Sequence, residues 1–313
     1  MRLPNCILSA LVTATSVSAA DFFVSPTGSD SNTGTSGASP FQTLPKAQQA
    51  VRGVLASSGT NITVNLAAGT YFLSAPLRLT AEDSGKSGSS VVWSGKDAVL
   101  SGGIKVTDWK LQSNGIYAAN VPAGTKSRNL YVNGKASNYA RRKVANRKDF
   151  TYSATGIRWS SSNYDWITSM TGINNAEVRF INSFTDRYAK IKSAGNKELV
   201  MAQQGWFNQM WGYDTPAKNN ADFGVWVQGT LGLLNEGGQF YLDSVAGKVY
   251  YKPLNGEDMS KVDTYLAELE TLVSVGGTYA SPAHDITFKD INFVSSFCPL
   301  ITNHALKLMH ACV

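Results

Sequence analysis

Four aspartates of this 313-residue sequence lie beside aromatic residues, and paired carboxyl groups can cleave a glycosidic bond. One carboxyl group acts as the acid and the other as nucleophile or base, about 5–10 Å away. Nothing in the spacing of the four brings any two together. Asp186 and Arg187 alternatively form a structural ion pair beside Tyr188. The candidates are Asp165 in NYDWI, Asp186 in FTDRY, Asp214 in GYDTP and Asp222 in NADFG.

Tryptophan is concentrated in residues 158–229, which hold five of the seven tryptophans in the chain. An aromatic ring can stack on a sugar because it combines an apolar face with a polar edge. The alternative is that these side chains form the core of a β-rich domain, and we expect that role for most of them. The candidate sugar-binding aromatic residues are Trp159, Trp166, Trp211 and Tyr213.

A basic segment precedes the tryptophans: residues 126–148 contain eight Lys or Arg and no Asp or Glu. Arg141 and Arg142 in this segment can hold the carboxylates of uronic acids through two parallel hydrogen bonds. The alternative is a solvated, positively charged surface. His284 has no partner at metal-ligand spacing, and we predict neither a metal site nor a cofactor.

Short strands separated by Gly, Ser and Asp turns dominate the chain, which predicts an all-β fold. One amphipathic helix precedes most of them. Leu44, Ala47, Val51 and Leu55 recur at helical spacing, with Thr43 as its cap. A helix in this place is expected to cover the open end of a β-solenoid, where exposed strand edges would otherwise pair with other chains.

Two further segments support a coiled arrangement of strands. GGQFYLDSVAGKVYYKP, residues 237–253, predicts a hairpin connected by DSVAGK. HDITFKDINFVSSF, residues 284–297, contains the alternating pairs Ile286/Phe288 and Ile291/Phe293, interrupted at Lys289-Asp290. This pattern is typical of one corner of a solenoid rung, with the Ile and Phe side chains pointing inward.

Several motifs in the same order resemble secreted fungal proteins of the pectate-lyase-like superfamily, in the branch of β-helical glycoside hydrolases. They include FFVSPTGSDSNTGT, VNLAAGTYFLSAPLRLTAEDSG, LYVNGK, GGQFYLDSVAGKVYYKPLNGEDM and AHDITFKDINF. The resemblance covers roughly residues 21–297. It implies a right-handed parallel β-helix, capped by a helix and interrupted by an inserted domain, with the catalytic carboxylates on later rungs.

The resemblance and the composition together predict five segments. We expect a signal peptide at 1–20, a cap with the first β-helix strands at 21–125, and an inserted β-rich domain at 126–240. The β-helix returns at 241–297, and an irregular tail follows at 298–313. The tail CPLITNHALKLMHACV has no rung pattern, which indicates that the chain is truncated. It also contains Cys298 and Cys312, whose pairing the sequence leaves open.

The first twenty residues have the pattern of a secretory signal: a positive residue, an apolar core and a small-residue cleavage site. No later run is apolar enough to span a membrane, so we expect an extracellular protein. The net charge of +6 then favours an acidic polysaccharide over nucleic acid as partner. Asn61 begins the only N-glycosylation sequon, at the start of a predicted strand.

These observations favour a secreted, glycoside hydrolase-like protein that acts on plant cell-wall polysaccharide. The chain is expected to lack the main catalytic rungs and to be monomeric at full length. The alternatives are a non-catalytic carbohydrate-binding or surface protein, and a polyuronate lyase, which needs calcium held by several carboxylates.

Overall fold

The computed structural model describes residues 19–86, 88–144, 146–218 and 224–296. The expected signal peptide up to residue 18, Asp222 and the tail 298–313 lie outside these residues. The chain forms two compact units. Of the described residues, those up to 101 and those from 272 to 293 form unit 1, and those from 102 to 271 and from 294 to 296 form unit 2. The boundaries expected at 126 and 240 both fall inside unit 2.

Unit 1 is built on a sheet in which β1, β2, β5 and β23 are successive neighbours. β1 pairs with β2, and β2 pairs with β5, both in parallel. β3 also pairs in parallel with β5, and β4 pairs in parallel with β22. The all-β class is confirmed. The strands are β1 (Ala20–Val24), β2 (Ile62–Leu66), β3 (Gly69–Phe72), β4 (Leu77–Leu79), β5 (Val91–Ser101), β22 (Val273–Val275) and β23 (Ile286–Val294).

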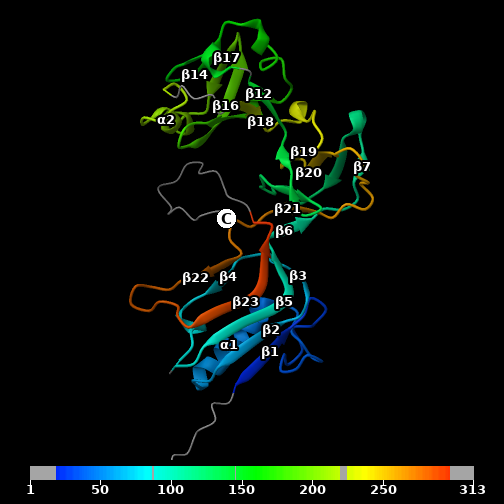
Figure 1. The fold of residues 1–313 in the computed structure, drawn as a ribbon, viewed down its shortest axis with the longest axis vertical. Coiled ribbons are helices and arrows are strands. Elements are labelled where there is room, and N and C mark those ends of the chain that lie inside the picture. Colours follow the sequence, from blue (N-terminus) through cyan, green and yellow to red (C-terminus); the bar gives the residue numbers. More distant parts are fainter. Residues whose placement is uncertain (1–18, 87, 145, 219–223, 297–313) are drawn as a thin grey trace, which may run out of the picture. The chain divides into compact units, whose positions relative to one another are not determined.

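The predicted helix is present as α1 (Leu44–Ser57) and lies against the sheet (Figure 1). Thr43 caps it, because its hydroxyl oxygen accepts a hydrogen bond from the Lys46 amide at 3.3 Å. All four apolar residues predicted for its inner face are buried, and they share one core with residues of β1, β2 and β5. No helix in the described residues is long and apolar enough to cross a membrane.

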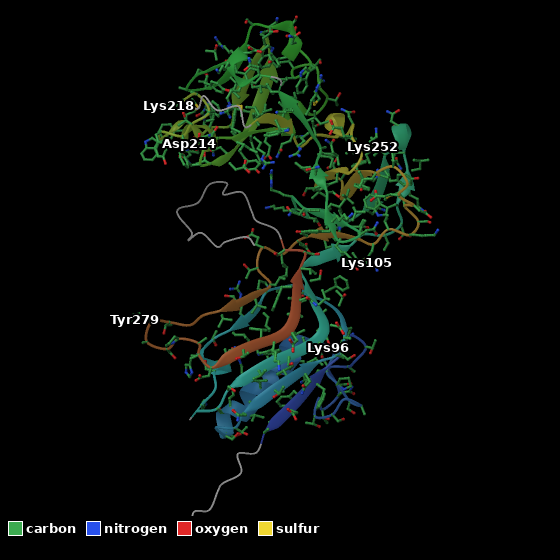
Figure 2. The ribbon with its side chains drawn as sticks, viewed as in Figure 1. Lys96, Lys105, Asp214, Lys218, Lys252 and Tyr279 are labelled. Carbon is green, nitrogen blue, oxygen red and sulfur yellow. The ribbon has the colours of Figure 1, made fainter. Side chains whose placement is uncertain are left out.

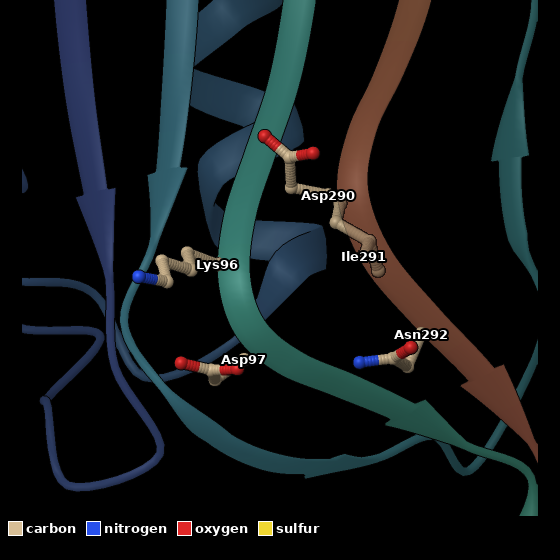
Figure 3. A pocket seen from close by; sticks show the side chains of 5 residues that line it. All are labelled: Lys96, Asp97, Asp290, Ile291 and Asn292. Atoms are coloured by element: carbon tan, nitrogen blue, oxygen red, sulfur yellow. The ribbon is translucent and has the colours of Figure 1, made fainter.

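β5 and β23 both turn a corner part-way along their length. Asp97 in β5 and Asp290 in β23 have positive φ angles of 61° and 56°, and their side chains flank the bend (Figure 3). The first half of β5 therefore pairs with β2 and the second half with β3. The break predicted at Lys289-Asp290 is confirmed. Phe288, just before it, stacks on Trp93 with ring centroids 6.3 Å apart.

The described residues of unit 2 form three sheets and one short α-helix, α2 (Gly205–Met210). The first sheet is antiparallel, with the order β10-β9-β21-β6. The second has the order β11-β19-β20-β8-β7. Their strands are β6 (Gly103–Lys105), β7 (Lys110–Leu111), β8 (Tyr117–Asn120), β9 (Leu130–Val132), β10 (Lys135–Ala136), β11 (Asn138–Tyr139), β19 (Gln239–Asp243), β20 (Lys248–Lys252) and β21 (Thr264–Ala267).

The predicted hairpin is formed by β19 and β20, which are antiparallel from Gln239↔Lys252 to Asp243↔Lys248. The Asp243 carboxylate accepts hydrogen bonds from the amides of Val245 and Ala246 at 3.1 and 2.9 Å, which stabilises the connection.

The third sheet of unit 2 is antiparallel throughout, and seven strands form it in the order β12-β18-β15-β16-β17-β14-β13. Its apolar face supplies much of the largest core of the unit. The strands are β12 (Arg141–Val144), β13 (Phe150–Tyr152), β14 (Gly156–Trp159), β15 (Glu177–Ile181), β16 (Asp186–Gly195), β17 (Glu198–Met201) and β18 (Val225–Gln228).

Candidate binding pocket in unit 2

Four neighbouring strands of the third sheet, β12, β18, β15 and β16, have one apolar and one charged face. Side chains alternate along a strand, so the register decides which residues share a face. Val144, Val225, Val178 and Phe180 belong to the core face and are buried. The opposite face carries two rows of paired residues: Arg141, Gln228, Glu177 and Lys190 in one, and Lys143, Trp226, Arg179 and Tyr188 in the other.

Glu177 lies at the base of this charged face and is only 5 % exposed. Arg128 donates to both of its carboxylate oxygens, at 3.1 Å to Oε2 and by a shorter bond to Oε1. The Gln228 side-chain amide donates to Oε1 at 2.6 Å. A buried carboxylate needs such partners, since an unpaired one would be costly. Glu177 therefore holds Arg128 in a fixed orientation.

The Arg128 guanidinium lies between two aromatic rings. Its carbon is 5.5 Å from the ring centroid of Tyr139 and 5.0 Å from that of Tyr188. Burial alone would lower the pKa of Arg128, but the hydrogen bond and charge of Glu177 raise it above its ordinary value. Burial raises the pKa of Tyr139 to about 12 and that of Tyr188 also to about 12, so both phenols stay neutral hydrogen-bonding groups.

A second ion pair joins Arg179 and Asp186 through two hydrogen bonds, of 2.9 and 2.7 Å. The Tyr188 hydroxyl donates to the same carboxylate at 3.0 Å. Asp186 therefore pairs with Arg179 across the β15–β16 register. The ion pair expected between Asp186 and Arg187 is wrong, because neighbours along a strand point to opposite faces. Arg187 instead donates to the Thr185 hydroxyl and to carbonyl oxygens of α2.

These groups border an open cavity of about 410 Å³, within the size range of small-molecule sites. Its lining is polar and aromatic, and it includes three guanidinium groups. The lining residues are Arg128, Asn129, Ser137, Asn138, Tyr139, Arg141, Arg179, Asp186, Tyr188 and Gln228. We call this cavity the arginine pocket.

The arginine pocket is better suited to binding than to acid–base cleavage. A glycosidase needs one carboxyl group that keeps a proton to donate and a second that attacks or activates water. Glu177 and Asp186 each bind a guanidinium group through two hydrogen bonds, and Glu177 is buried and does not line the cavity. The lining therefore presents one carboxylate, that of Asp186, and not a pair.

Two of the other predicted catalytic aspartates, Asp165 and Asp214, have structural partners. Asp165 accepts a hydrogen bond from the Trp159 indole at 3.3 Å and lies 3.6 Å from the Lys197 ammonium. Asp214, labelled in Figure 2, is buried and accepts hydrogen bonds from the amides of Ser183 and Phe184 at 3.2 and 2.9 Å. Asp214 thus stabilises the turn between β15 and β16.

The two predicted arginines lie on opposite faces of β12. Arg141 lines the arginine pocket, and its guanidinium carbon is 5.5 Å from the Trp226 ring centroid. Arg142 lies on the other face, 4.3 Å from the Trp166 ring centroid. The structure therefore does not place them in one site, because adjacent residues of an extended strand point in opposite directions.

The predicted aromatic residues have different environments. Trp159 is buried in the core, whereas Trp211 and Tyr213 are 73 % and 79 % exposed. The Tyr213 ring has an edge contact with Phe184, with centroids 6.2 Å apart. Trp211 and Tyr213 thus remain accessible for stacking, and Trp159 does not.

Sequence reasoning missed Arg128, Tyr139, Glu177, Arg179 and Tyr188. The alternation in EVRFI and DRYAK indicated a polar strand face, but such faces are usually only solvated. The pairing of Arg128 with Glu177 joins residues 49 positions apart, and no local pattern signals it.

Two further sites lie outside the arginine pocket: the predicted glycosylation site at Asn61 and a depression in unit 1. Asn61 is exposed, and its side-chain oxygen accepts a hydrogen bond from the Ser90 amide at 3.0 Å; its glycosylation stays a prediction. A depression at the corner of β5 and β23 is lined by Lys96, Asp97, Asp290, Ile291 and Asn292 (Figure 3). No cluster of three or more potential metal ligands occurs within the described residues.

Among known proteins, the chain is similar to solved structures but to no family profile or curated sequence. A solved structure named "Glycoside hydrolase" matches with a TM-score of 0.73 and 25% sequence identity, covering 88% of this chain and 50% of that one. A structure described as the complex of XylC with xylose is more distant, with a TM-score of 0.36, 12% identity, and coverage of 88% and 35%. The chain has a glycoside hydrolase-like fold and spans half the length of the first structure.

Proposed function

We propose that this chain belongs to a secreted carbohydrate-active protein of the glycoside hydrolase type that acts on plant cell-wall polysaccharide. The observation that carries the proposal is the similarity to the glycoside hydrolase structure, with a TM-score of 0.73 across 88% of the chain. The arginine pocket supports it, because its hydroxyl, amide and guanidinium groups suit a hydroxylated ligand.

We further propose a right-handed parallel β-helix for unit 1, in the manner of the fungal pectate-lyase-like proteins. The parallel pairing of β1, β2 and β5, and the corners at Asp97 and Asp290, support it. Ile291 in β23 is partly buried and Phe293 is exposed. Further rungs in a longer protein would cover both side chains and would carry the catalytic carboxylates.

A second candidate is a carbohydrate-binding protein without catalysis. The arrangement of the carboxylates favours it, because Asp186 is the one carboxylate that lines the arginine pocket, and it is bound to Arg179 through two hydrogen bonds.

Binding and cleavage can be measured together. The purified 313-residue chain would be tested on polygalacturonate, xylan and arabinan, by affinity electrophoresis and by release of reducing ends. We expect retardation by at least one polysaccharide without release of reducing ends. Retardation by none of the three would contradict the proposed function. Release of reducing ends would place a catalytic pair within this chain and favour the hydrolase over the binding protein.

A further inference from the structure

We propose that the arginine pocket binds the carboxylate of a uronic acid residue in an acidic polysaccharide, and that Arg141 is the residue that contacts it. This inference rests on the proposed function and adds the class of sugar.

The charges around the pocket do not balance. Glu177 neutralises Arg128, and Asp186 neutralises Arg179, each through two hydrogen bonds. Arg141 takes part in no ion pair within the described residues. Arg141 is therefore the one guanidinium group of the lining without a directly bound carboxylate, and the charge of Glu236 acts on it without an ion pair.

The environment of Arg141 favours an added anion. Arg141 is partly exposed as a residue, and one of its terminal nitrogens donates to the Asn138 side-chain oxygen at 2.9 Å. Burial, and then the nearby charge of Arg179, lower the pKa of Arg141 below its ordinary value and outweigh the opposite effects of Glu236 and Tyr188. A negative ligand would relieve both effects, because it would offset the desolvation and the repulsion between the two guanidinium groups.

The chemistry of Arg141 selects a planar anion. A guanidinium has five N–H donors in a fixed fork, and it can bind both oxygens of a carboxylate at once. The single bond to Asn138 leaves donors for this purpose, and it also fixes the orientation of the fork.

The remainder of the lining suits the hydroxyl groups of the same sugar. Asn129, Ser137 and Asn138 supply amide and hydroxyl groups, and the neutral phenols of Tyr139 and Tyr188 add further hydrogen-bonding partners. A neutral sugar would make these contacts but would leave the charge of Arg141 unpaired.

Lys143 provides a matched control. It lies on the same strand and the same face as Arg141, and its ammonium is 5.9 Å from the Trp226 ring centroid. It does not line the cavity. Substitution of either residue by alanine removes one positive charge from β12, so the two variants differ in the position of the lost charge.

The test is calorimetric titration of the 313-residue chain with trigalacturonic acid, with its methyl ester and with neutral xylotriose. We expect Arg141→Ala to weaken binding of the acid about 10- to 100-fold, as expected for a lost charge-assisted pair, and Lys143→Ala to weaken it less than about 3-fold. The methyl ester should bind the unchanged chain about as weakly as the acid binds Arg141→Ala. Arg141→Lys should restore only part of the affinity, because an ammonium cannot form the fork.

Three results would overturn the inference. Equal affinity for the acid and its methyl ester would show that the carboxylate is not recognised, while the proposed function would stand. Equal losses in Arg141→Ala and Lys143→Ala would indicate general attraction to a basic surface. Binding of xylotriose but not of trigalacturonic acid would assign the pocket to neutral sugars. Failure of all three ligands and of every polysaccharide would instead remove the proposed function. Unchanged thermal unfolding of the variants confirms that they are folded.

Discussion

Glu177 determines the geometry of the arginine pocket, although it is hidden beneath the cavity. It orients Arg128 and accepts a hydrogen bond from Gln228. Its burial distinguishes it from the exposed charges of the same face, whose ion pairs contribute little to stability. A buried carboxylate with two partners is costly to replace, because the partners remain behind.

We expect Glu177→Gln to lower the free energy of unfolding by about 3 kcal/mol, because Arg128 loses its counter-charge in a partly buried position. Urea unfolding followed by fluorescence measures the change. Glu198→Gln is the matched control, since its partner Arg158 is largely exposed, and it should have little effect. Equal effects of the two substitutions would show that Glu177 is not the structural support of the pocket.

The residues of the pocket show where sequence reasoning ends. Arg141 was found because a run of basic residues without acidic ones is visible locally. Arg179 and Tyr188 were missed, because they meet only through the register of β15 and β16. Arg128 was missed because it precedes β9 and reaches the pocket only through its bond to Glu177. The register depends on which face of each strand is buried, and the amino-acid sequence alone does not show which strands pair with each other.

At the scale of elements, Asp83 connects α1 to the turn after β4. This turn is a short 3-10 helix, η1 (Ala81–Asp83). The Asp83 carboxylate accepts hydrogen bonds from Arg52 at 2.7 Å, from Gln48 at 3.0 Å and from the Thr80 amide at 2.7 Å. The first two donors lie on α1, so Asp83 fixes the helix against the sheet.

We expect Asp83→Asn to lower the free energy of unfolding by about 2–3 kcal/mol, because Arg52 then lacks its charged partner. Chemical unfolding at neutral pH measures this change. Glu82→Gln tests the same arginine through an exposed ion pair, and it should have a much smaller effect. A larger loss in Glu82→Gln than in Asp83→Asn would contradict this account of how α1 is held.

The stabilisation by the Asp83 carboxylate is expected to depend on pH. Burial would raise the pKa of Asp83, but hydrogen bonds from Arg52, Thr80 and Gln48 outweigh it and lower the pKa below its ordinary value. The group therefore stabilises the fold above its ordinary pKa of about 4, and this contribution disappears as the pH falls through the lowered value. The stability difference between the unchanged chain and Asp83→Asn should shrink below about pH 4. A difference that grows on acidification would contradict this.

Substitutions of Asp290 test the corner of β23 through their effect on stability. Asp290 has a positive φ of 56° and an exposed side chain. A β-branched residue is unfavourable in this backbone region, so Asp290→Val should cost about 1–2 kcal/mol, whereas Asp290→Gly should cost little. Lys289→Val, at an exposed neighbour with ordinary backbone geometry, is the control. Equal thermal stability of the two valine variants would argue against a corner at this position.

Local elements were predicted better than their assembly. The positions of α1, the β19–β20 hairpin and the corner in β23 follow from short-range signals: apolar spacing, a cap, turn residues and alternation. The third sheet of unit 2 was expected only as an inserted β-rich domain. Its strand order joins segments that are distant in sequence, such as β12 and β18, and no periodicity within one segment reveals such a pairing.

At the scale of the whole molecule, secretion is the expectation with the simplest test. The first twenty residues have the pattern of a signal peptide, and β1 begins at Ala20, next to the expected cleavage site. N-terminal sequencing of protein recovered from the culture medium of an expressing cell should begin at or near Asp21. A sequence beginning at Met1 would contradict the expected cleavage.

Binding of an acidic sugar in the arginine pocket of unit 2 is tested most directly by a crystal structure of the 313-residue chain with trigalacturonic acid. We predict a galacturonate carboxylate within hydrogen-bonding distance of both terminal nitrogens of Arg141, with the Arg128–Glu177 and Arg179–Asp186 pairs intact. A sugar bound only at Trp211 and Tyr213, or at the corner between β5 and β23, with the arginine pocket empty, would contradict it.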